Sequence, residues 1–309
     1  MVVSDIDIRL LKVFKAVVES GGYARAQTIL GVSQSTISTQ MSQLEVRVGY
    51  SLCHRGRSGF RLTSEGEDFY ELTKELFRSI IQFQTQVSEL KEGLSGTLKI
   101  AFLDNVISDN KNPLKNALSK FVRHPENTVQ IKLESLPPAD MEKGLLNGSL
   151  DIAIGIFDDH VSGLHYKPLY EEHDVLACHH SHPLAKIDNA HVLGNALPAT
   201  KKIVREFIGR REYPFDDFSE VSASVTSLEA STMLILTGQY IGFLPKHYAK
   251  PWLDVGELVA LVPENFNRVS QFSLVTKDSV QSQSRSLELL VSCIVDSCSD
   301  RTDRTQDIL

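Results

Sequence analysis

The stretch from Val32 to Glu45 constrains the fold of this 309-residue chain more than any other part of it. At about 100° per residue, the spacing of an α-helix, its apolar side chains fall on one stripe and short polar side chains cover the other faces. Solvent-facing helix positions usually carry Glu and Lys, which are better helix formers. The stripe consists of Ile37, Met41, Leu44 and Val48, and the opposite face carries Ser35, Thr39 and Ser42, flanked by Thr36, Ser38 and Gln43.

Short hydroxyl and amide side chains suit a helix in the major groove of DNA, because they donate and accept hydrogen bonds at base edges and phosphates. An ordinary polar surface helix is the alternative. The upstream residues favour the first interpretation, since Tyr23–Leu30 predicts a short helix and Gly31-Val32-Ser33 predicts a tight turn with Ser33 as N-cap. A helix, a turn with glycine and a hydroxyl-rich helix form the helix-turn-helix arrangement.

Two further segments complete a small N-terminal domain. Apolar residues recur at helical spacing from Ile8 to Val18, and Ser20-Gly21-Gly22 ends that helix, so it can pack behind the other two. Residues 51–63 predict two short strands around a turn rich in glycine and arginine. Beside a recognition helix, such a basic hairpin would be a wing that contacts phosphates or the minor groove. A solvated basic loop is the alternative.

Charge is distributed unevenly along the chain. The net charge of -7 by itself argues against nucleic acid as a partner. Residues 1–63, however, hold eight Lys/Arg and four Asp/Glu residues, a net charge of +4, which leaves -11 on the remaining residues. A basic head on an acidic body orients the molecule toward DNA and keeps the body away from it.

From Ser64 to about Glu92 the sequence contains no proline, and it predicts a helix of roughly 40 Å at 1.5 Å per residue. A small head cannot cover the apolar seam of so long a helix, so a partner helix from a second subunit is the expected cover. A helix packed on its own body is the alternative. The seam residues are Phe69, Leu72, Leu76, Ile80, Phe83, Val87 and Leu90.

Beyond the joint at residues 91–96, strands and helices alternate, which predicts an open α/β arrangement of two lobes with a cleft between them. Ligands bind such sheets at the carboxyl ends of the strands. The first lobe would hold strands 97–103, 128–134 and 149–156, helices 113–123 and 139–147, and, after the return of the chain, strand 271–276 and helix 284–296. The chain would cross at 164–169 into strands 174–177, 196–199, 221–225 and 240–244 with helices 203–208 and 228–237.

Several classes of protein and site find little support. A membrane span would need about 18 consecutive apolar residues, which the sequence lacks, and no secretory leader pattern is present, so a cytoplasmic protein is expected. No nucleophile elbow, Walker loop or dinucleotide-binding glycine motif points to an enzyme or a cofactor. The cluster Cys178-His179-His180-Ser181-His182, with His173 upstream, holds metal-binding residue types, but a turn need not bring them together, so no metal is expected. Reduced, ordinary thiols are expected for Cys53, Cys178, Cys293 and Cys298.

Taken together and in this order, several fragments resemble a LysR-type transcriptional regulator over essentially the whole chain. In the head these are Val32-Ser33-Gln34-Ser35, Ser38, Leu44-Glu45, Gly49, Leu52, Arg55, Leu62-Thr63 and Gly66. In the body they are residues 148–154, His182-Pro183-Leu184-Ala185 and Gly242-Phe243-Leu244-Pro245. Gly22, Gln27, Cys53 and Glu65 depart from the family pattern, and Cys53 is interpreted as a smaller apolar filler.

The resemblance implies an α/β protein with an N-terminal winged helix-turn-helix, a long linker helix that dimerises, and a two-lobed effector domain of periplasmic-binding-protein type, with tetramers common. The implied domains are 1–63 (DNA binding), 64–93 (dimerisation helix and hinge), 94–300 (effector binding) and a polar tail at 301–309. Lobe I would comprise 94–163 and 268–299, and lobe II 164–267.

Carried over residue by residue, the resemblance implies contacts to DNA and to an effector. The DNA set is Ser33, Gln34, Ser35, Thr36, Ser38, Thr39 and Gln40 in the helix, with Arg55 and Arg57 in the wing. The effector set is Asp104, Asn105 and Ser108 after the first strand of the body, Thr200 after a strand of the second lobe, and Ser227 and Leu228 at a helix start. Hydroxyls at helix N-termini would favour a carboxylate, whereas Asp104 and Glu229 would repel one.

The expected function is therefore that of a non-enzymatic regulator that binds an inverted-repeat promoter site in double-stranded DNA and responds to a small molecule between its lobes. Its other partners would be further copies of itself, as a dimer or a tetramer, and RNA polymerase is a further candidate. A thiol- or metal-responsive regulator on the same scaffold, and an enzyme with an accessory DNA-binding head, stay as alternatives.

Overall fold

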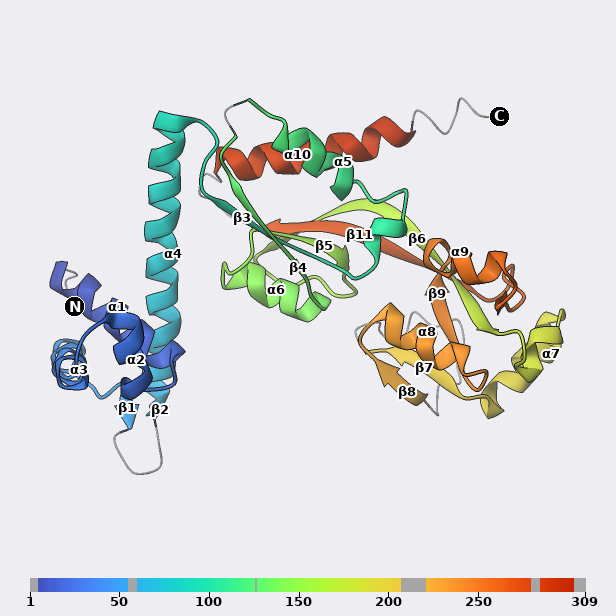
Figure 1. Cartoon of the computed structure of the whole chain (residues 1–309), viewed down its shortest axis with the longest axis horizontal. Coiled ribbons are helices and arrows are strands. Elements are labelled where there is room, and N and C mark those ends of the chain that lie inside the picture. The colour runs from blue at the N-terminus through green and yellow to red at the C-terminus, as the bar shows by residue number, and fades with distance from the viewer. Residues whose placement is uncertain (1–4, 55–59, 126, 207–220, 279–283, 303–309) are drawn as a thin grey trace. The chain divides into compact units, whose positions relative to one another are not determined.

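The computed structural model describes residues 5–54, 60–125, 127–206, 221–278 and 284–302. The chain separates into two compact units, residues 1–84 (unit 1) and residues 85–309 (unit 2), which are described one at a time. Figure 1 labels the helices and strands of both. No helix in the described ranges is both long and apolar enough to span a membrane.

Unit 1 contains the predicted helix-turn-helix and hairpin (Figure 1). Ile37, Met41 and Leu44 of the predicted stripe are fully buried in one core with Phe14, so the hydroxyl-rich side faces outward. The predicted turn is confirmed as well, since Gly31 adopts a left-handed conformation and the Ser33 side chain accepts a hydrogen bond from the Thr36 N–H. The elements are α1 (Asp5–Glu19), α2 (Tyr23–Leu30), α3 (Gln34–Val48), β1 (Cys53–His54), β2 (Arg61–Leu62) and α4 (Ser64–Glu92).

Two polar contacts fix α3 relative to its neighbours. The buried carboxylate of Asp7 in α1 forms an ion pair with Arg47 in the last turn of α3. Glu45 accepts a hydrogen bond from the Leu52 N–H at 2.9 Å, which ties α3 to the start of the hairpin. Because a buried charge without its partner is costly, these contacts hold α3 at a defined angle in the unit.

Two departures from the family pattern have structural explanations. Gly22 is the N-cap of α2 with φ of 140°, no side chain caps the helix there, and an added Cβ would lie 3.2 Å from Phe60. Cys53 is buried in the apolar core of unit 1, which agrees with its interpretation as a filler.

The long helix α4 forms as predicted and spans 29 residues. Its first part packs on the core of unit 1 through Phe69, Leu76 and Phe77. Other seam residues are exposed: Leu72 in the packed part of the helix, and Phe83 and Val87 beyond it, with Phe83 66 % exposed. The head therefore covers only part of the predicted seam.

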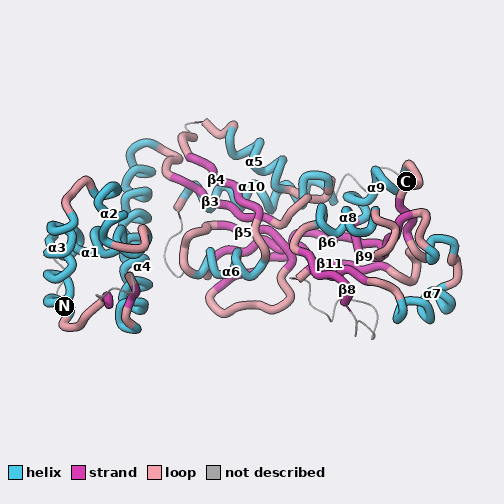
Figure 2. Tube along the Cα trace, turned by 60° about the horizontal axis from the view of Figure 1, so that its bottom comes forward, coloured by secondary structure: helices cyan, strands magenta, loops and turns pink. Residues whose placement is uncertain are grey.

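Unit 2 is built on one nine-stranded sheet that runs through both lobes, with helices on its faces (Figures 1 and 2). The strand order is β4-β3-β5-β11-β6-β9-β7-β8, and β10 pairs with β6. The lobe I strands β3, β4 and β5 are parallel, as are the lobe II strands β7, β8 and β9, and the antiparallel pair β6/β11 joins the two sets. The strands are β3 (Thr97–Phe102), β4 (Gln130–Ser135), β5 (Ile152–Ile156), β6 (Leu164–His179), β7 (Lys202–Arg205), β8 (Val221–Val225), β9 (Ile241–Pro245), β10 (Leu258–Ala260) and β11 (Asn267–Lys277).

Helices cover the sheet in both lobes. In lobe I, α5 packs against α10 on one face and α6 lies on the other (Figure 1). The predicted helices of lobe I are confirmed, and the predicted helix 228–237 is α8. The helices are α5 (Leu114–Val122), α6 (Pro138–Leu146), α7 (Ala190–Ala196), α8 (Leu228–Leu236), α9 (Lys246–Asp254) and α10 (Arg285–Thr302), with 3-10 turns η1 (Val106–Ser108), η2 (Pro183–Lys186) and η3 (Leu197–Ala199).

The prediction was wrong between residues 196 and 208. Residues 196–199, predicted as a strand, end α7 and form η3, while β7 occupies Lys202–Arg205, where a helix was predicted. The run Lys-Ile-Val-Arg is buried on both faces of the sheet and pairs with β8 and β9, so its apolar residues follow a strand pattern that is too short to distinguish from a helix turn. Neither α7 nor α9 was predicted from the sequence.

Gly66 allows the closest backbone approach in unit 1. A Cβ there would lie 2.0 Å from the carbonyl oxygen of Leu52, and the Gly66 N–H donates to Thr63 Oγ1 at 2.9 Å. The backbone carbonyl cannot move without disturbing the hairpin, so any side chain at this position forces α4 away from the head.

We expect Gly66→Ala to lower the free energy of unfolding of unit 1 by about 1–3 kcal/mol, because it overpacks a backbone contact. Gly194→Ala is the matched control, since a Cβ at this α7 glycine meets nothing within 4 Å, and it should be neutral or stabilising by about 0.5–1 kcal/mol. Urea unfolding followed by far-UV circular dichroism and by fluorescence of the single tryptophan, Trp252 in α9, separates the two units. Equal stability of Gly66→Ala and the wild type would contradict the expectation.

Candidate functional site

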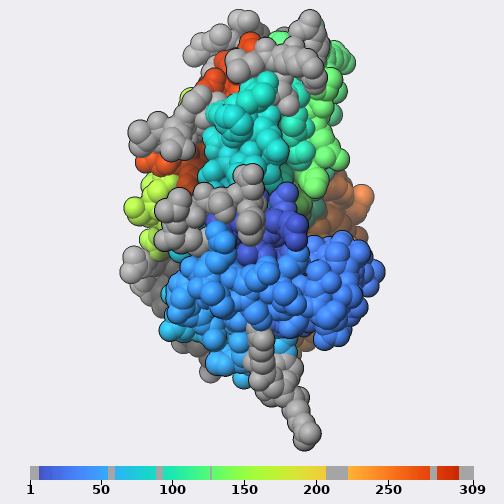
Figure 3. Space-filling view, turned by 90° about the vertical axis from the view of Figure 1, so that its left-hand side faces the viewer, coloured from blue at the N-terminus to red at the C-terminus, as the bar shows by residue number. Residues whose placement is uncertain are grey.

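The first candidate site is the outer face of α3. Ser33, Gln34, Ser35, Thr36 and Thr39 are all exposed, and Ser38 is half-buried. α3 lies at the left of Figure 1, so it is on the side of unit 1 that faces the viewer in Figure 3. The N-terminus of α3, where backbone N–H groups and the positive end of the helix dipole converge, opens onto the same face.

The hydroxyl groups on this face are linked to one another. Ser33 Oγ lies 2.8 Å from Ser35 Oγ and 2.9 Å from Thr36 Oγ1, and Thr39 Oγ1 donates to the Ser35 carbonyl at 3.0 Å. The network holds the side chains in fixed positions, while the hydroxyl oxygens of Ser35, Thr36 and Thr39 each keep a lone pair that can accept a further hydrogen bond. Such a face is preorganised for polar contacts to a ligand surface.

Gln40 differs from the other members of the predicted DNA set. Its side chain is only 9 % exposed, and its Oε1 has no hydrogen-bond partner among the described residues. At 100° per residue, Gln40 falls about 40–60° from Ile37 and Leu44, on the packed side of the helix. The structure therefore does not place Gln40 on the outer face. The wing residues Arg55 and Arg57 lie outside the described residues.

The second candidate site lies where the two lobes of unit 2 meet. Asp104 follows β3 of lobe I, Arg205 ends β7, Leu228 follows β8, and His247 follows β9 of lobe II. All four therefore lie at carboxyl ends of parallel strands, the position where ligands bind in open α/β sheets. This position was predicted from the sequence, although Arg205 and His247 were not.

Asp104 binds two groups of lobe II. Its carboxylate forms an ion pair with the buried guanidinium of Arg205 and accepts a hydrogen bond from the Leu228 N–H at 2.7 Å. Burial lowers the pKa of Arg205, and the negative charge of Asp104 partly offsets that shift. The Asp104 carboxylate therefore occupies the N-terminus of α8, the position that was expected to favour the carboxylate of a ligand. Ser227 caps α8 by accepting from the Ala230 N–H.

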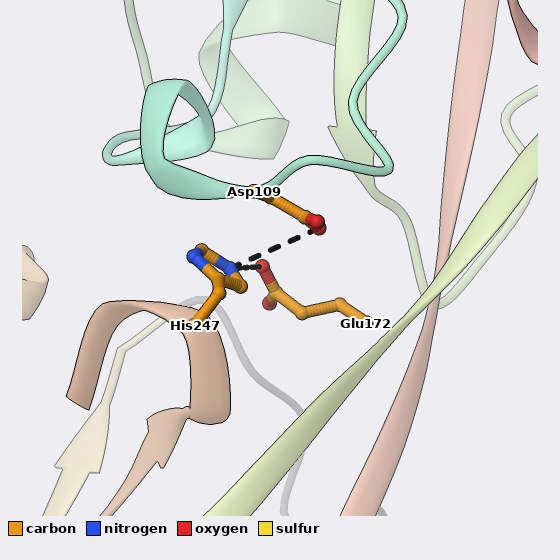
Figure 4. A group of neighbouring side chains, drawn as sticks. All are labelled: Asp109, Glu172 and His247. Atoms are coloured by element: carbon orange, nitrogen blue, oxygen red, sulfur yellow. Dashed lines mark hydrogen bonds and ion pairs between the residues drawn. The ribbon is translucent and has the colours of Figure 1, made fainter. Parts of the chain in front are cut away.

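A second group of polar side chains joins the lobes nearby. His247 Nε2 lies 2.9 Å from Glu172 Oε1 of the crossing strand β6 and 3.9 Å from Asp109 Oδ2, which follows η1 (Figure 4). On its other side, His247 Nδ1 lies 2.9 Å from Ser108 Oγ. Burial raises the pKa of Glu172, and the hydrogen bond with His247 partly offsets this shift. Asp109, Glu172 and His247 each offer an atom that can coordinate a metal ion, and these three atoms all lie within 4.8 Å of one another.

The contacts of Thr200 do not place it at the lobe junction. It was expected to follow a strand, whereas it precedes β7, and its hydroxyl donates to the Ala196 carbonyl at 2.9 Å. Arg205 lies at the carboxyl end of β7 instead. A sequence prediction with the strand at its observed position would have identified Arg205 as a candidate. Glu172 lies in the middle of a long strand, and no local sequence pattern distinguishes it.

The cysteine and histidine cluster of the sequence is divided between a core and a turn. Cys178 is buried in the lobe II core, where burial raises its pKa to about 12. His182 is the N-cap of η2 and its Nδ1 accepts from the Leu184 N–H, whereas His179 Nδ1 pairs with Ser181 Oγ. Neighbouring residues of β6 point to opposite faces of the sheet, so Cys178 and His179 do not share a ligand set.

Comparison with known proteins identifies both units. Residues 8–67 match the model of the bacterial regulatory helix-turn-helix protein, lysR family, and residues 91–299 match the model of the LysR substrate binding domain. The chain is 35 % identical over 276 residues to the HTH-type transcriptional activator BauR of Pseudomonas aeruginosa, covering 89 % of this chain and 90 % of that protein.

Solved structures share the fold. The LysR family regulator CbnR matches with a TM-score of 0.64 at 21 % identity, over 94 % of this chain and 99 % of that chain. Full-length CbnR complexed with its target DNA matches with a TM-score of 0.65 at 21 % identity, over the same shares of the two chains. The chain therefore belongs to the LysR family of bacterial helix-turn-helix transcriptional regulators.

Proposed function

We propose that this regulator binds an inverted-repeat promoter site through the outer face of α3, as a dimer or tetramer assembled through α4. A small-molecule effector between the lobes of unit 2 would modulate that binding. The observation that carries the proposal is the exposed, preorganised hydroxyl face of α3, opposite the fully buried Ile37, Met41 and Leu44. The crystal structure of full-length CbnR complexed with its target DNA supports the same use of the shared fold.

The proposed DNA contacts are the exposed polar residues of α3. Ser33 at the N-cap and the half-buried Ser38 would contact phosphate, and Gln34, Ser35, Thr36 and Thr39 would contact bases or nearby backbone. A glutamine can donate and accept at the N6 and N7 positions of adenine, which neither a serine nor an alanine can do in a bidentate manner. Gln40 is left out of this proposal because it is buried.

We expect Gln34→Ala to weaken discrimination at one base pair of each half-site by about 1–3 kcal/mol while leaving affinity for random DNA nearly unchanged. The measurement is the affinity of the full chain for its own promoter fragment and for variants with single base-pair changes, at one fixed salt concentration. Gln239→Ala, the same change at an exposed glutamine of unit 2, is the control and should preserve the ranking. An unchanged ranking in Gln34→Ala would remove Gln34 from the interface.

The proposed dimer interface is the uncovered seam of α4. Of the seam residues, Leu72, Phe83 and Val87 are exposed on a helix that is too long for its own head to cover. A second copy of the helix offers the same apolar surface, so a twofold dimer buries both. Two heads held in this way can occupy half-sites separated by whole turns of the duplex.

Phe83→Glu should raise the dimer dissociation constant by at least about 100-fold, since burying one such side chain stabilises by about 1.5–3 kcal/mol and each dimer loses two. Gln84→Glu introduces the same charge at the adjacent exposed position and should leave assembly intact. Sedimentation velocity over a concentration series gives the dimer dissociation constants of both variants. If Phe83→Glu dimerises as tightly as Gln84→Glu, the interface lies elsewhere.

The proposed effector site is the junction of the lobes, formed by Asp104, Asn105 and Ser108 on one side and by Ser227 and Leu228 on the other. Asp104 holds the lobes together through Arg205 and the Leu228 N–H. An effector that binds one arrangement of the lobes better than another shifts the population between them. Contacts that it makes with Arg205 or the start of α8 would compete with Asp104, which gives the ligand a direct means of changing the arrangement.

Asp104→Asn should destabilise unit 2 by roughly 1.5–3 kcal/mol, because it removes the charged partner of a buried guanidinium. Urea unfolding monitored by Trp252 fluorescence tests this expectation, with Asp188→Asn at an exposed position as the control. If both variants unfold like the wild type, the Asp104–Arg205 pair does not hold the lobes together.

A further inference from the structure

The second polar cluster of the lobe junction has features that the proposed function does not use. Asp109 belongs to the segment after β3, Glu172 to the crossing strand β6, and His247 to the first turn of α9 (Figure 4). Glu172 is only 5 % exposed and Asp109 only 8 % exposed, and His247 Nε2 points at both carboxylates. Three side chains that can bind a metal ion thus converge from three distant parts of the sequence.

Polar contacts on both sides of the imidazole fix the direction in which His247 Nε2 points. Ser108 Oγ donates to the Asn105 carbonyl at 3.2 Å, so toward His247 the Ser108 oxygen can only accept. His247 Nδ1, at 2.9 Å from that oxygen, can donate its proton to Ser108. On the other side of the ring, Nε2 lies 2.9 Å from Glu172 Oε1. A metal ion bound at Nε2 would therefore meet a ring that Ser108 already orients.

The charge balance of the junction also calls for positive charge. Four carboxylates lie in this group, from Asp104, Asp109, Glu172 and Asp174, and two guanidinium groups accompany them: Arg205 pairs with Asp104, and Arg268 pairs with Asp174. Asp109 and Glu172 both face the imidazole of His247. Buried carboxylates in excess are costly unless they are protonated or bound to a cation.

The spacing of the three ligand atoms suits a small divalent ion. They all lie within 4.8 Å of one another, with His247 Nε2 at 2.9 Å and 3.9 Å from the two carboxylates. With bonds of about 2.0–2.2 Å, a tetrahedral ion needs its ligands roughly 3.3–3.6 Å apart, so shifts of about 1 Å in side chains complete the site. Nδ1–H of His247 bound to Ser108 is the outer contact that metal-ligating histidines usually have.

We propose that Asp109, Glu172 and His247 form a binding site for a divalent transition-metal ion, with one nitrogen and two carboxylate ligands and at least one open position. The ion links lobe I, the crossing strand and lobe II. It therefore stabilises the arrangement of the lobes in which the three side chains meet. Its open position accepts water or a donor atom of a small molecule. The proposal does not depend on DNA binding or on an organic effector.

The test uses Zn²⁺ as the probe. The full chain is treated with a chelator, dialysed, and titrated with Zn²⁺ against a chromophoric competitor at neutral pH. We expect one tight site in the wild type and a loss of affinity of at least tenfold in His247→Gln and in Glu172→Gln. His173→Gln, at an exposed histidine next to Glu172, is the matched control and should bind like the wild type.

Ser108→Ala gives a second measurement that a chance surface histidine would not affect. It removes the acceptor of the Nδ1 proton without touching a ligand, so it should weaken Zn²⁺ binding by about 10–100-fold. Trp252 fluorescence, from the same helix as His247, verifies that each variant is folded. Equal Zn²⁺ affinity of His247→Gln and the wild type overturns the proposal, as does a wild type without a tight site. Loss of the site in His179→Gln instead assigns the ion to the exposed turn and also overturns it.

Discussion

The antiparallel pairing of β6 with β11 is the constraint on which unit 2 depends. These two strands cross from one lobe to the other within a single sheet, and their register runs from Leu164–Lys277 to Val175–Asn267 with one irregularity at Phe272/Ser273. The parallel strands on either side are thereby oriented so that the carboxyl ends of β3, β7, β8 and β9 meet. Loops and helix N-termini therefore gather at this position, which is where ligands bind in open α/β sheets.

Charge then determines how the meeting lobes interact. Asp104 and Arg205 lie 101 residues apart in sequence, and Asp104 and Leu228 lie 124 apart, so neither contact is local. Ion pairs and hydrogen bonds between lobes are directional, whereas apolar contacts tolerate sliding. A junction held by a few charged groups can therefore change arrangement when a ligand or a cation competes for one of them, without repacking either lobe's core.

In unit 1, by contrast, the candidate site is built from residues that are close together in the sequence. The exposed hydroxyl residues of α3 lie within one turn or two of each other, and the buried Ile37, Met41 and Leu44 fix which side faces outward. Asp7–Arg47 and Glu45–Leu52 then hold α3 in the unit. Burial of the apolar stripe thus determines which residues of α3 face outward. Gln40 is buried, so it marks one edge of the outer face.

Helical periodicity, capping residues and glycine turns acted over a few residues, so the sequence by itself determined the helix-turn-helix, the long helix α4, the alternating body and the loop after β3. The secondary structure of residues 196–208 was predicted wrongly, because a four-residue strand such as β7 is stabilised by its partner strands in the sheet. Four residues are too few to show a hydrophobic periodicity. Only the tertiary structure decided that Arg205 neutralises Asp104 and that Glu172, His247 and Asp109 converge. These contacts join residues from separate strands, and long-range pairing leaves no mark in local sequence.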